Sequence, residues 1–237
     1  MPQPQVIFFD AVGTLFGVNG TVGDIYGQFA QAAGLTVDSR QLDAAFRSSF
    51  RTAPRAMFQQ ADAQEFMRLE YEWWQEIARQ SFAQVGVLAQ ISNFNQFFRP
   101  LFDHFATATP WFVYPEVPET LACLKHSDVA LAIISNFDSR LHPVLQALGL
   151  AEWFSSVTIS THVGVAKPEA FIFETALAQH GVRPEQAWHV GDDWTEDYQG
   201  ALAAGLQGVW LNRDRIHTRT ATLEIGNLSM LQAILHP

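Results

Sequence analysis

The chain contains little cysteine and no long hydrophobic segment. Its 237 residues include a single cysteine, Cys123, which excludes an internal disulfide framework and favours a reducing compartment. The longest uninterrupted apolar run, residues 129–134, is far shorter than the ~20 residues that a membrane-spanning helix needs. No basic leader followed by an apolar segment opens the sequence. We therefore expect a cytoplasmic protein that has no membrane partner.

Basic residues are also scarce. The chain has 14 lysines and arginines against 24 aspartates and glutamates, which gives a formal net charge of −10. Nucleic-acid binding depends largely on clustered basic side chains, so we expect no nucleic-acid partner. Only two lysines occur, Lys125 and Lys167. Because Lys167 lies at a predicted strand-to-helix junction, near acidic segments, it is a candidate for chemistry rather than for surface charge.

The sequence signatures of several other enzyme classes are absent. The glycine-rich stretch 17–23 lacks both the G-x-G-x-x-G spacing and the lysine of a phosphate-binding P-loop. No G-x-S-x-G segment is present, which removes the basis for a serine hydrolase. The histidines form no pair at metal-ligand spacing, and one cysteine cannot build a zinc site. Nucleotide binding, serine hydrolysis and zinc chemistry therefore have no support in the sequence.

The pattern of apolar runs predicts an α/β fold. Short β-type runs at residues 5–9, 129–134, 156–160, 187–190 and 208–211 alternate with helix-like segments. This alternation is typical of a doubly wound parallel sheet. In the segment 168–180, Pro168 suits the first helical position and Gly181 suits the helix end. The 48% of apolar residues is enough for one such core and an additional subdomain.

An inserted helical subdomain is predicted between the first two strands of the sheet, because more than one hundred residues separate them. The helices expected there span residues 22–33, 39–52, 62–84 and 93–107. We place the subdomain at residues 19–112 and the core at residues 1–18 and 113–237.

Apolar positions three and four residues apart mark the buried faces of the inserted helices. They are Phe66, Leu69, Trp73 and Ile77, followed by Phe94, Phe97, Phe98, Leu101 and Phe105. Most of these aromatic side chains are expected to form the core of the subdomain. The alternative is that a few aromatic residues, among them Tyr26, Trp73 or Trp74, contact a substrate.

Four polar segments follow predicted strands. Asp10 comes directly after the apolar run 6–9, Ser135 and Asn136 end a second run, Lys167 precedes a helix, and Asp192, Asp193 and Asp197 follow a third run. A lone aspartate at a strand end is usually a turn or cap residue. The four segments together indicate a ligand site instead, because open α/β sheets bind ligands at the carboxyl ends of their strands.

With these four segments the sequence resembles the haloacid dehalogenase-like hydrolase superfamily. The stretch from Ser135 to Leu141, together with His189–Asp192, is most similar to its branch of rhythmically expressed proteins. The resemblance implies a Rossmann-like core with a helical cap of the first type, and a cap that selects the substrate.

The same resemblance implies the roles of individual residues. Asp10 would be the nucleophile, Lys167 would hold Asp10 and the phosphoryl group, and Ser135 and Asn136 would donate hydrogen bonds to the transferring oxygens. The metal ligands would be Asp10, Asp192, Asp197 and the main-chain oxygen of Val12. Such hard oxygen ligands favour Mg²⁺.

Val12 departs from the family pattern. Phosphatases of this superfamily have a second aspartate at this position, which protonates the leaving group and later activates water. Valine can do neither, and loss of a positioned acid or base costs ~10²- to 10⁴-fold in rate. Asp138, Asp193 or a group on the substrate could replace it, and the sequence does not select among them.

Three functions remain open at this point. The first is a Mg²⁺-dependent hydrolase that acts on a small phosphorylated metabolite through an aspartyl-phosphate on Asp10. The second is a 2-haloacid dehalogenase-like hydrolase, because displacement of a halide needs no proton for the leaving group. The third is a binding or regulatory protein with little turnover. The intact acidic segment 191–197 favours the first.

Overall fold

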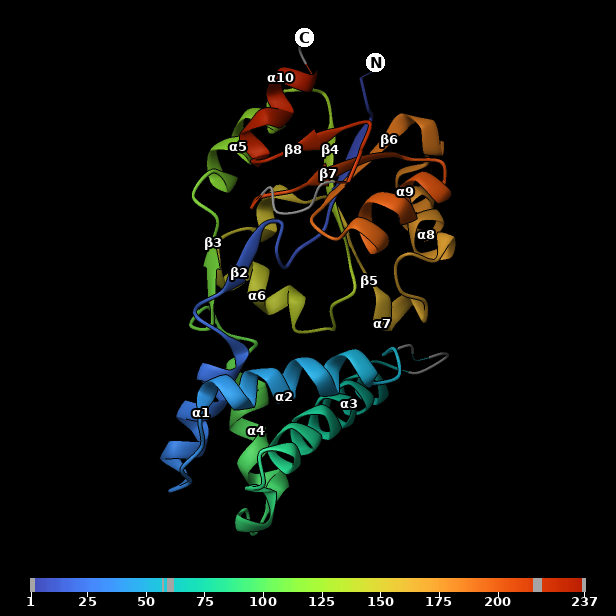
Figure 1. Ribbon diagram of the computed structural model, residues 1–237. Helices are drawn as coiled ribbons and strands as arrows, with labels where there is room; N and C mark the ends of the chain where they lie inside the picture. The colour runs from blue at the N-terminus through green and yellow to red at the C-terminus, as the bar shows by residue number, and fades with distance from the viewer. Residues whose placement is uncertain (1–2, 57, 59–61, 215–218, 236–237) are drawn as a thin grey trace. The chain divides into compact units, whose positions relative to one another are not determined.

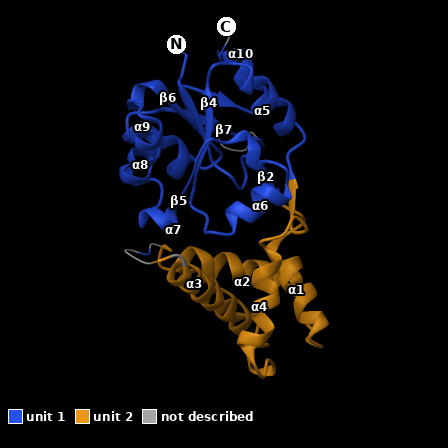
Figure 2. Ribbon diagram, turned by 180° about the vertical axis from the view of Figure 1, so that it is seen from behind, with its two compact units in different colours: residues 1–17, 57–59, 113–237 blue, residues 18–56, 60–112 orange. Residues whose placement is uncertain are grey.

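The computed structural model describes residues 3–56, 58, 62–214 and 219–235. The chain divides into two compact units (Figure 2). Residues 1–17, 57–59 and 113–237 form the first, which we call the core unit, and residues 18–56 and 60–112 form the second, the helical unit. No helix among the described residues is long and apolar enough to cross a membrane.

A six-stranded sheet in the order β5-β4-β1-β6-β7-β8 forms the centre of the core unit (Figure 1). The strands are β1 (Val6–Phe9), β4 (Ala130–Ser135), β5 (Val157–Ile159), β6 (Ala187–Gly191), β7 (Gln207–Leu211) and β8 (Glu224–Ile225). All neighbouring pairs are parallel, and β1 lies between β4 and β6. The predicted doubly wound parallel sheet is confirmed. The two-residue strand β8 was not predicted, because it is too short to show a periodic pattern.

Helices cover both faces of this sheet (Figure 1). On one face, α8 (Ala170–His180) and α9 (Gly200–Ala203) pack against Val6 and Phe8 of β1. Figure 1 shows α5 (Val117–Lys125) and α10 (Leu231–Leu235) on the other side. The shorter elements are α6 (Leu141–Ala147), α7 (Ser160–Val163) and the single turns η2 (Ala151–Trp153), η3 (Pro184–Gln186), η4 (Trp194–Gln199) and η5 (Leu228–Met230). Because β1 and β4 are buried on both sides, they consist almost entirely of apolar residues.

Helix α8 begins at Ala170, so the prediction that Pro168 would occupy its first position is wrong. The side chain of Asn136 accepts a hydrogen bond from the Lys167 N–H at 2.8 Å and donates one to the Lys167 carbonyl at 3.1 Å. These bonds hold residue 167 in a turn, and the Lys167–Pro168 peptide bond is cis. Gly181 ends the helix with φ +63°, as its freedom from a side chain allows.

The helical unit contains α1 (Val22–Ala32), α2 (Ser39–Thr52), α3 (Ala63–Gln84), α4 (Phe94–His104) and the turn η1 (Leu88–Gln90). Each long helix starts after a side chain that accepts hydrogen bonds from its first backbone N–H groups, namely Thr21, Asp38, Asp62 and Asn93. Such caps stabilise a helix start by about 1 kcal/mol. They explain why the predicted boundaries differ from the observed starts by at most one residue.

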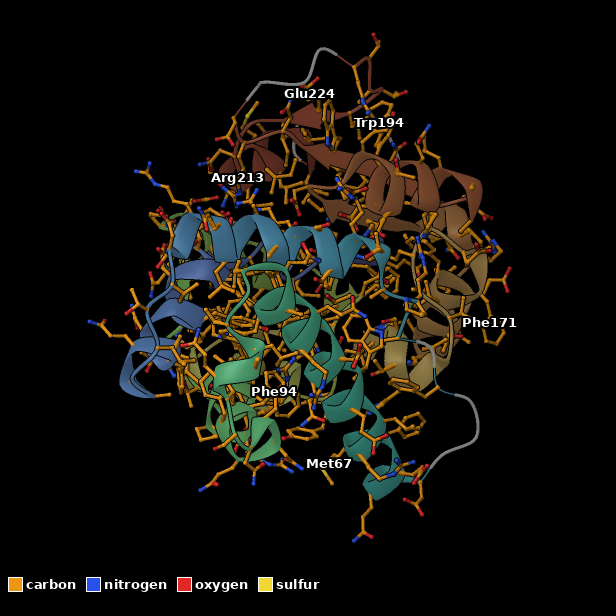
Figure 3. All side chains as sticks on the ribbon, turned by 60° about the horizontal axis from the view of Figure 1, so that its bottom comes forward. Met67, Phe94, Phe171, Trp194, Arg213 and Glu224 are labelled. Atoms are coloured by element: carbon orange, nitrogen blue, oxygen red, sulfur yellow. The ribbon has the colours of Figure 1, made fainter. Side chains whose placement is uncertain are left out.

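The buried face of α3 differs in part from the predicted one. Ile77 is buried as expected, but the core is formed by Tyr71, Ala78 and Phe82, whereas Phe66, Leu69 and Trp73 are only half-buried. The predicted positions in and after α4 fit better, since Phe94, Phe98 and Leu101 are at most 6% exposed, whereas Phe97 and Phe105 are half-buried. Figure 3 labels Phe94 and also Met67 of α3, which is 56% exposed. Residues 64–69 of α3 thus include no fully buried side chain.

Among the aromatic candidates for substrate contact, Tyr26 belongs to the core of the helical unit. It is 3% exposed, and its ring packs against Phe46, Phe82 and Phe105. Trp73 and Trp74 are half-buried. The chain passes between the two units through the short paired strands β2 (Phe16–Val18) and β3 (Trp111–Val113).

Candidate active site

The four predicted segments meet at the carboxyl end of the central strands. Asp10 follows β1, Ser135 ends β4, Asp192 follows β6, and Lys167 lies in the loop before α8. One carboxylate oxygen from each of Asp10, Asp192 and Asp197 lies within 4.8 Å of the other two. The predicted nucleophile, the lysine and the acidic segment are therefore close together, although they are far apart in sequence.

Lys167 connects the two buried carboxylates of the acidic cluster, those of Asp10 and Asp197. Its ammonium donates to Asp10 Oδ1 at 2.7 Å, to Asp197 Oδ1 at 2.6 Å and to the carbonyl of Ile134 at 3.0 Å. Burial alone would lower the pKa of Lys167, but the charges of Asp10 and Asp197 outweigh it and raise that pKa. Because an ammonium has three N–H donors, these contacts use all of them in this geometry.

Asp197 is the best-satisfied carboxylate of the site. Besides Lys167, it accepts hydrogen bonds from His189 Nε2 at 3.0 Å and from the Asp193 N–H at 2.9 Å. Burial would raise its pKa, but Lys167 and the hydrogen bond from His189 keep the pKa of Asp197 below its usual value. A carboxylate that accepts several hydrogen bonds is stabilised in its ionised form.

His189 is a partner of the site that the sequence did not indicate. Its side chain is fully buried in β6, and burial lowers its pKa despite the neighbouring Asp197. The contact with a carboxylate therefore assigns the proton to Nε2. Nδ1 has no hydrogen-bond partner among the described residues. His189 has no metal-ligand spacing to another histidine, and the resemblance of the stretch His189–Asp192 to the family assigned it no role.

Asp10 and Asp192 have the opposite electrostatic character. Burial raises the pKa of Asp10 to about 7; Lys167 opposes this shift, and the charges of Asp197 and Asp192 add to it. The side chain of Asp192 is more exposed, yet desolvation and the charge of Asp197 raise its pKa to about 6. Three carboxylates thus share one ammonium. This excess of negative charge is what a bound cation would relieve.

The turn after Asp10 brings the backbone close to Asp192. Thr14 Oγ1 donates to Asp192 Oδ1 at 3.2 Å. Gly13 has φ +91°, and a Cβ at this position would collide with the carboxylate of Asp192. A glycine is therefore required here for both its backbone conformation and its small size. The neighbouring Val12 forms an isolated bridge with Phe16.

Ser135 and Asn136 lie beside Lys167 but differ in their hydrogen bonding. The Ser135 side chain is buried and has no hydrogen bond to any described residue. The Asn136 amide nitrogen donates to the Lys167 carbonyl and, at 2.8 Å, to Glu196 Oε2. Both of its amide hydrogens are thereby engaged. In this geometry the side chain of Asn136 positions Lys167, and Glu196, which belongs to the acidic segment 191–197 but was assigned no role from the sequence, is a further neighbour of the site.

Both protein residues considered as substitutes for the acid missing at position 12 have other partners. Asp138 is 3% exposed and binds the Arg140 guanidinium, with the closest contact at 2.6 Å. Asp193 caps the helical turn η4 by accepting from the N–H groups of Thr195 and Glu196, each at 2.7 Å. Neither carboxylate is placed to exchange a proton without losing these bonds.

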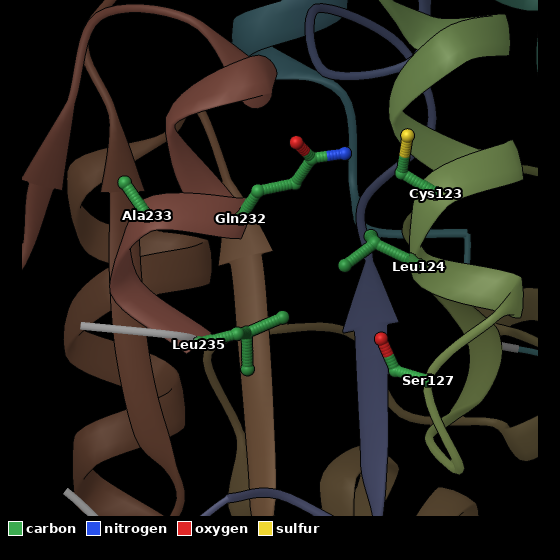
Figure 4. Close-up of a pocket in the computed structure, with 6 residues that line it drawn as sticks. All are labelled: Cys123, Leu124, Ser127, Gln232, Ala233 and Leu235. Carbon is green, nitrogen blue, oxygen red and sulfur yellow. The ribbon is translucent and has the colours of Figure 1, made fainter.

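The lone cysteine belongs to a different part of the core unit. Cys123 lines a pocket of about 440 Å³ between α5 and α10 (Figure 4). The other lining residues are Leu124, Ser127, Gln232, Ala233 and Leu235. None of them belongs to the acidic cluster.

Comparison with known proteins identifies the family to which this chain belongs. A family model for haloacid dehalogenase-like hydrolases matches residues 4–205. The chain is 33% identical over 202 residues to "haloacid dehalogenase-like hydrolase domain-containing protein 3" of Xenopus laevis, covering 85% of this chain and 82% of that protein. It is 28% identical to "rhythmically expressed gene 2 protein" of Drosophila melanogaster, over 85% of this chain and 80% of that protein. The expected branch is confirmed by these relatives.

Proteins that are named for different reactions are similar to this chain in sequence or in structure. A phosphoserine phosphatase of Thermus thermophilus is 41% identical over 102 residues, which are 43% of this chain and 41% of that protein. The L-2-haloacid dehalogenase RSc1362 superposes with a TM-score of 0.76 at 18% identity. The HAD-hydrolase YfnB of Bacillus subtilis, solved with magnesium bound, superposes with a TM-score of 0.75 at 18% identity. Each superposition covers 100% of this chain and 100% of the other chain. The chain is a member of the haloacid dehalogenase-like hydrolase family.

Proposed function

We propose that this hydrolase is a Mg²⁺-dependent phosphatase that acts on a small phosphorylated metabolite through an aspartyl-phosphate on Asp10. The observation that carries the proposal is the excess of charge in the site. Asp10, Asp192 and Asp197 place three carboxylate oxygens within 4.8 Å of one another, beside one ammonium. Displacement of a halide needs no cation, whereas attack by a carboxylate on a phosphate ester requires that their mutual repulsion be offset.

The residues present fit a hard divalent cation. We assign the direct contacts to the carboxylates of Asp10 and Asp192 and to the carbonyl of Val12. Asp197 already accepts hydrogen bonds from Lys167, His189 and the Asp193 N–H, so we assign it the role of holding Lys167. When bound, Mg²⁺ supplies positive charge that offsets the repulsion between the phosphate ester and the nucleophile. YfnB, which has the same fold, was solved with magnesium bound.

The chain's own residues then perform the phosphoryl transfer. Asp10 attacks phosphorus through a carboxylate oxygen, and the aspartyl-phosphate bond forms as the bond from phosphorus to the leaving-group oxygen breaks. Water then hydrolyses the aspartyl-phosphate, which releases inorganic phosphate and restores the Asp10 carboxylate. The Lys167 ammonium, 2.7 Å from Asp10 Oδ1, keeps this carboxylate oriented and favours its ionised form. The Ser135 hydroxyl, which has no other described partner, donates to a phosphoryl oxygen as charge develops there.

Val12 limits which substrates react well. Asp138 and Asp193 are held by Arg140 and by the start of η4, so neither of these two side chains takes over the role of the missing acid. The leaving group must then depart without a proton from the enzyme, or with one from the substrate itself. We expect good leaving groups to react readily and alkyl phosphates to react ~10²- to 10⁴-fold more slowly than in an enzyme with the acid.

We assign the choice of substrate to the inserted cap, residues 19–112, and catalysis to residues 1–18 and 113–237. The reaction would take place in the cytoplasm. A dehalogenase is the second candidate, because Val12 is compatible with loss of a halide that needs no proton and because RSc1362 has the same fold. A regulatory protein with little turnover is the third.

One experiment ranks the three functions. The purified protein is assayed with an aryl phosphate, with a panel of phosphorylated metabolites and with 2-haloacids, each in Mg²⁺ and in chelator. We expect phosphate release that needs Mg²⁺ and disappears in Asp10→Asn. Halide release in chelator would establish the dehalogenase instead, and absence of turnover in every well would favour the regulatory protein.

A further inference from the structure

We propose that Arg213 is a positioning residue for the metal site, because it clamps the turn that joins Asp10 to β2. Arg213 follows β7 and is labelled in Figure 3. It does not touch the reacting groups directly. The inference rests on the proposed function, since it assigns Arg213 a role in placing two of the metal ligands, the Val12 carbonyl and Asp192.

All three nitrogens of the Arg213 guanidinium donate hydrogen bonds, and an aromatic ring packs against its plane. Nε donates to the Gly13 carbonyl at 3.0 Å, Nη2 donates to the Thr14 carbonyl at 2.6 Å, and Nη1 pairs with Glu116 Oε1 at 2.6 Å. The ring of Tyr114 lies beneath it, 3.6 Å from the guanidinium carbon. This set of contacts uses the planar fork of arginine, which lysine cannot reproduce.

The residue that precedes Arg213 in the chain is also held by hydrogen bonds. The neighbouring Asn212 donates its N–H to the Ile225 carbonyl at 2.8 Å, and its side chain donates to Glu224 Oε1 at 2.8 Å. Asn212 is thus attached to β8. Asn212 and Arg213, which we call the clamp, therefore connect the edge strand of the sheet to the turn after its central strand β1.

A short path connects the clamp to the proposed ligands. Arg213 holds the Thr14 carbonyl, and the hydroxyl of the same Thr14 donates to Asp192 Oδ1 at 3.2 Å. Arg213 also holds the carbonyl of Gly13, whose peptide unit directly follows the carbonyl of Val12. The orientation of these peptide groups determines where the Val12 oxygen points. Partners of this kind, which orient metal ligands without binding the metal, typically change metal affinity 10- to 100-fold when they are removed.

An arginine that only stabilised the fold would show different behaviour. Its loss would lower the free energy of unfolding without changing the turn or the affinity for a metal. Two measurements separate the roles: hydrogen exchange of the Gly13, Leu15 and Phe16 amides without metal, and the Kd for Mg²⁺ by calorimetry. These amides donate within the turn, to Phe16 and Ala11.

The test compares Arg213→Lys with wild type and with two controls. Arg183→Lys is the matched control, because Arg183 has an ion pair of the same 2.6 Å length with Glu185, but both side chains are largely exposed. Glu116→Gln removes the charge of the ion pair while leaving both carbonyl contacts possible. We expect Arg213→Lys to speed exchange of the turn amides and to raise the Kd for Mg²⁺, each by about tenfold, while Arg183→Lys changes neither and Glu116→Gln changes both by less.

Each outcome decides the inference. Unchanged exchange, or faster exchange with an unchanged Kd for Mg²⁺, would overturn the positioning role. If Arg213→Lys does not fold, Tyr114→Leu gives the same two readouts, since it removes the ring below the guanidinium and leaves every charge in place. A wild-type protein that binds no Mg²⁺ would contradict the proposed function itself, and exchange of the turn amides would then decide the clamp alone.

Discussion

The inner and outer halves of the site differ in how their charges are balanced. The inner half consists of Lys167, Asp197 and His189, which are buried and joined by hydrogen bonds of 2.6 and 3.0 Å. The outer half consists of Asp192 and the turn at Val12, and Asp10 belongs to both. The pKa of Asp197 is lowered, whereas the pKa values of Asp10 and Asp192 are raised to about 7 and 6. The charges of the inner half are balanced without a metal ion, whereas those of the outer half are not.

The largest expected effect follows from Asp10, which joins the two halves. Asp10→Asn keeps an oxygen that can accept from Lys167 but cannot form an acyl phosphate by the same attack. We expect the turnover of an aryl phosphate to fall by more than about 10³-fold. Steady-state kinetics measures this, with circular dichroism as the control for folding. Full activity in this variant would place the nucleophile elsewhere.

The inner half is broken by Lys167→Met. This change leaves Asp10 and Asp197 buried without their shared cation, so we expect the free energy of unfolding to fall by about 3–5 kcal/mol. Urea denaturation followed by fluorescence measures it. The chain offers one matched control, because its other lysine, Lys125, is exposed. Lys125→Met should change stability by less than about 0.5 kcal/mol, and equal losses in the two variants would refute the distinction.

The outer half is tested by restoring the missing acid. Val12→Asp should raise the rate of aryl phosphate hydrolysis by about 10²-fold, because a carboxyl group could then exchange a proton with the leaving group. Val12→Asn has nearly the same shape and cannot transfer that proton, so it serves as the control. An equal gain in both variants, or no gain in a folded Val12→Asp protein that binds Mg²⁺, would contradict the account.

How much of this site could be predicted depends on the range of the contacts. Asp10, Ser135, Lys167 and Asp192 were predictable, because each follows or flanks an apolar strand and the ends of parallel strands meet. Arg213 was not, since its contacts with the turn span 199 and 200 residues and depend on where the loop after β7 lies.

The helices show the same limit. Their starts are set by local caps, so they were predicted closely. The buried face of α3 depends on its neighbours: Tyr71 packs against Phe98 and Phe102 of α4, whereas Trp73 donates to the carbonyl of Pro54. Hydrophobic spacing alone could not choose between these positions. For the same reason the role of His189 followed only from its contact with Asp197.

A smaller effect is expected on stability in the absence of metal. The folded protein raises the pKa of Asp192 from 3.8 to about 6, so this carboxylate contributes stability below pH 4 and loses that contribution as the pH rises through 6. Asp192→Asn keeps an acceptor for Thr14 and removes the charge. Without metal at pH 7.5, it should be more stable than wild type by about 1 kcal/mol, after allowance for solvent screening. Urea denaturation at pH 7.5 and pH 4 checks this, because the difference should vanish at pH 4.

Calorimetric titration of the protein with Mg²⁺, at pH 7.5 and at pH 5.5, tests the incomplete outer half most directly. Protons and the cation compete for Asp10 and Asp192, so binding should be measurable at pH 7.5, clearly weaker at pH 5.5 and lost in Asp192→Asn. Affinity that is independent of pH, or equal in wild type and Asp192→Asn, would contradict the assignment of these two carboxylates to the metal.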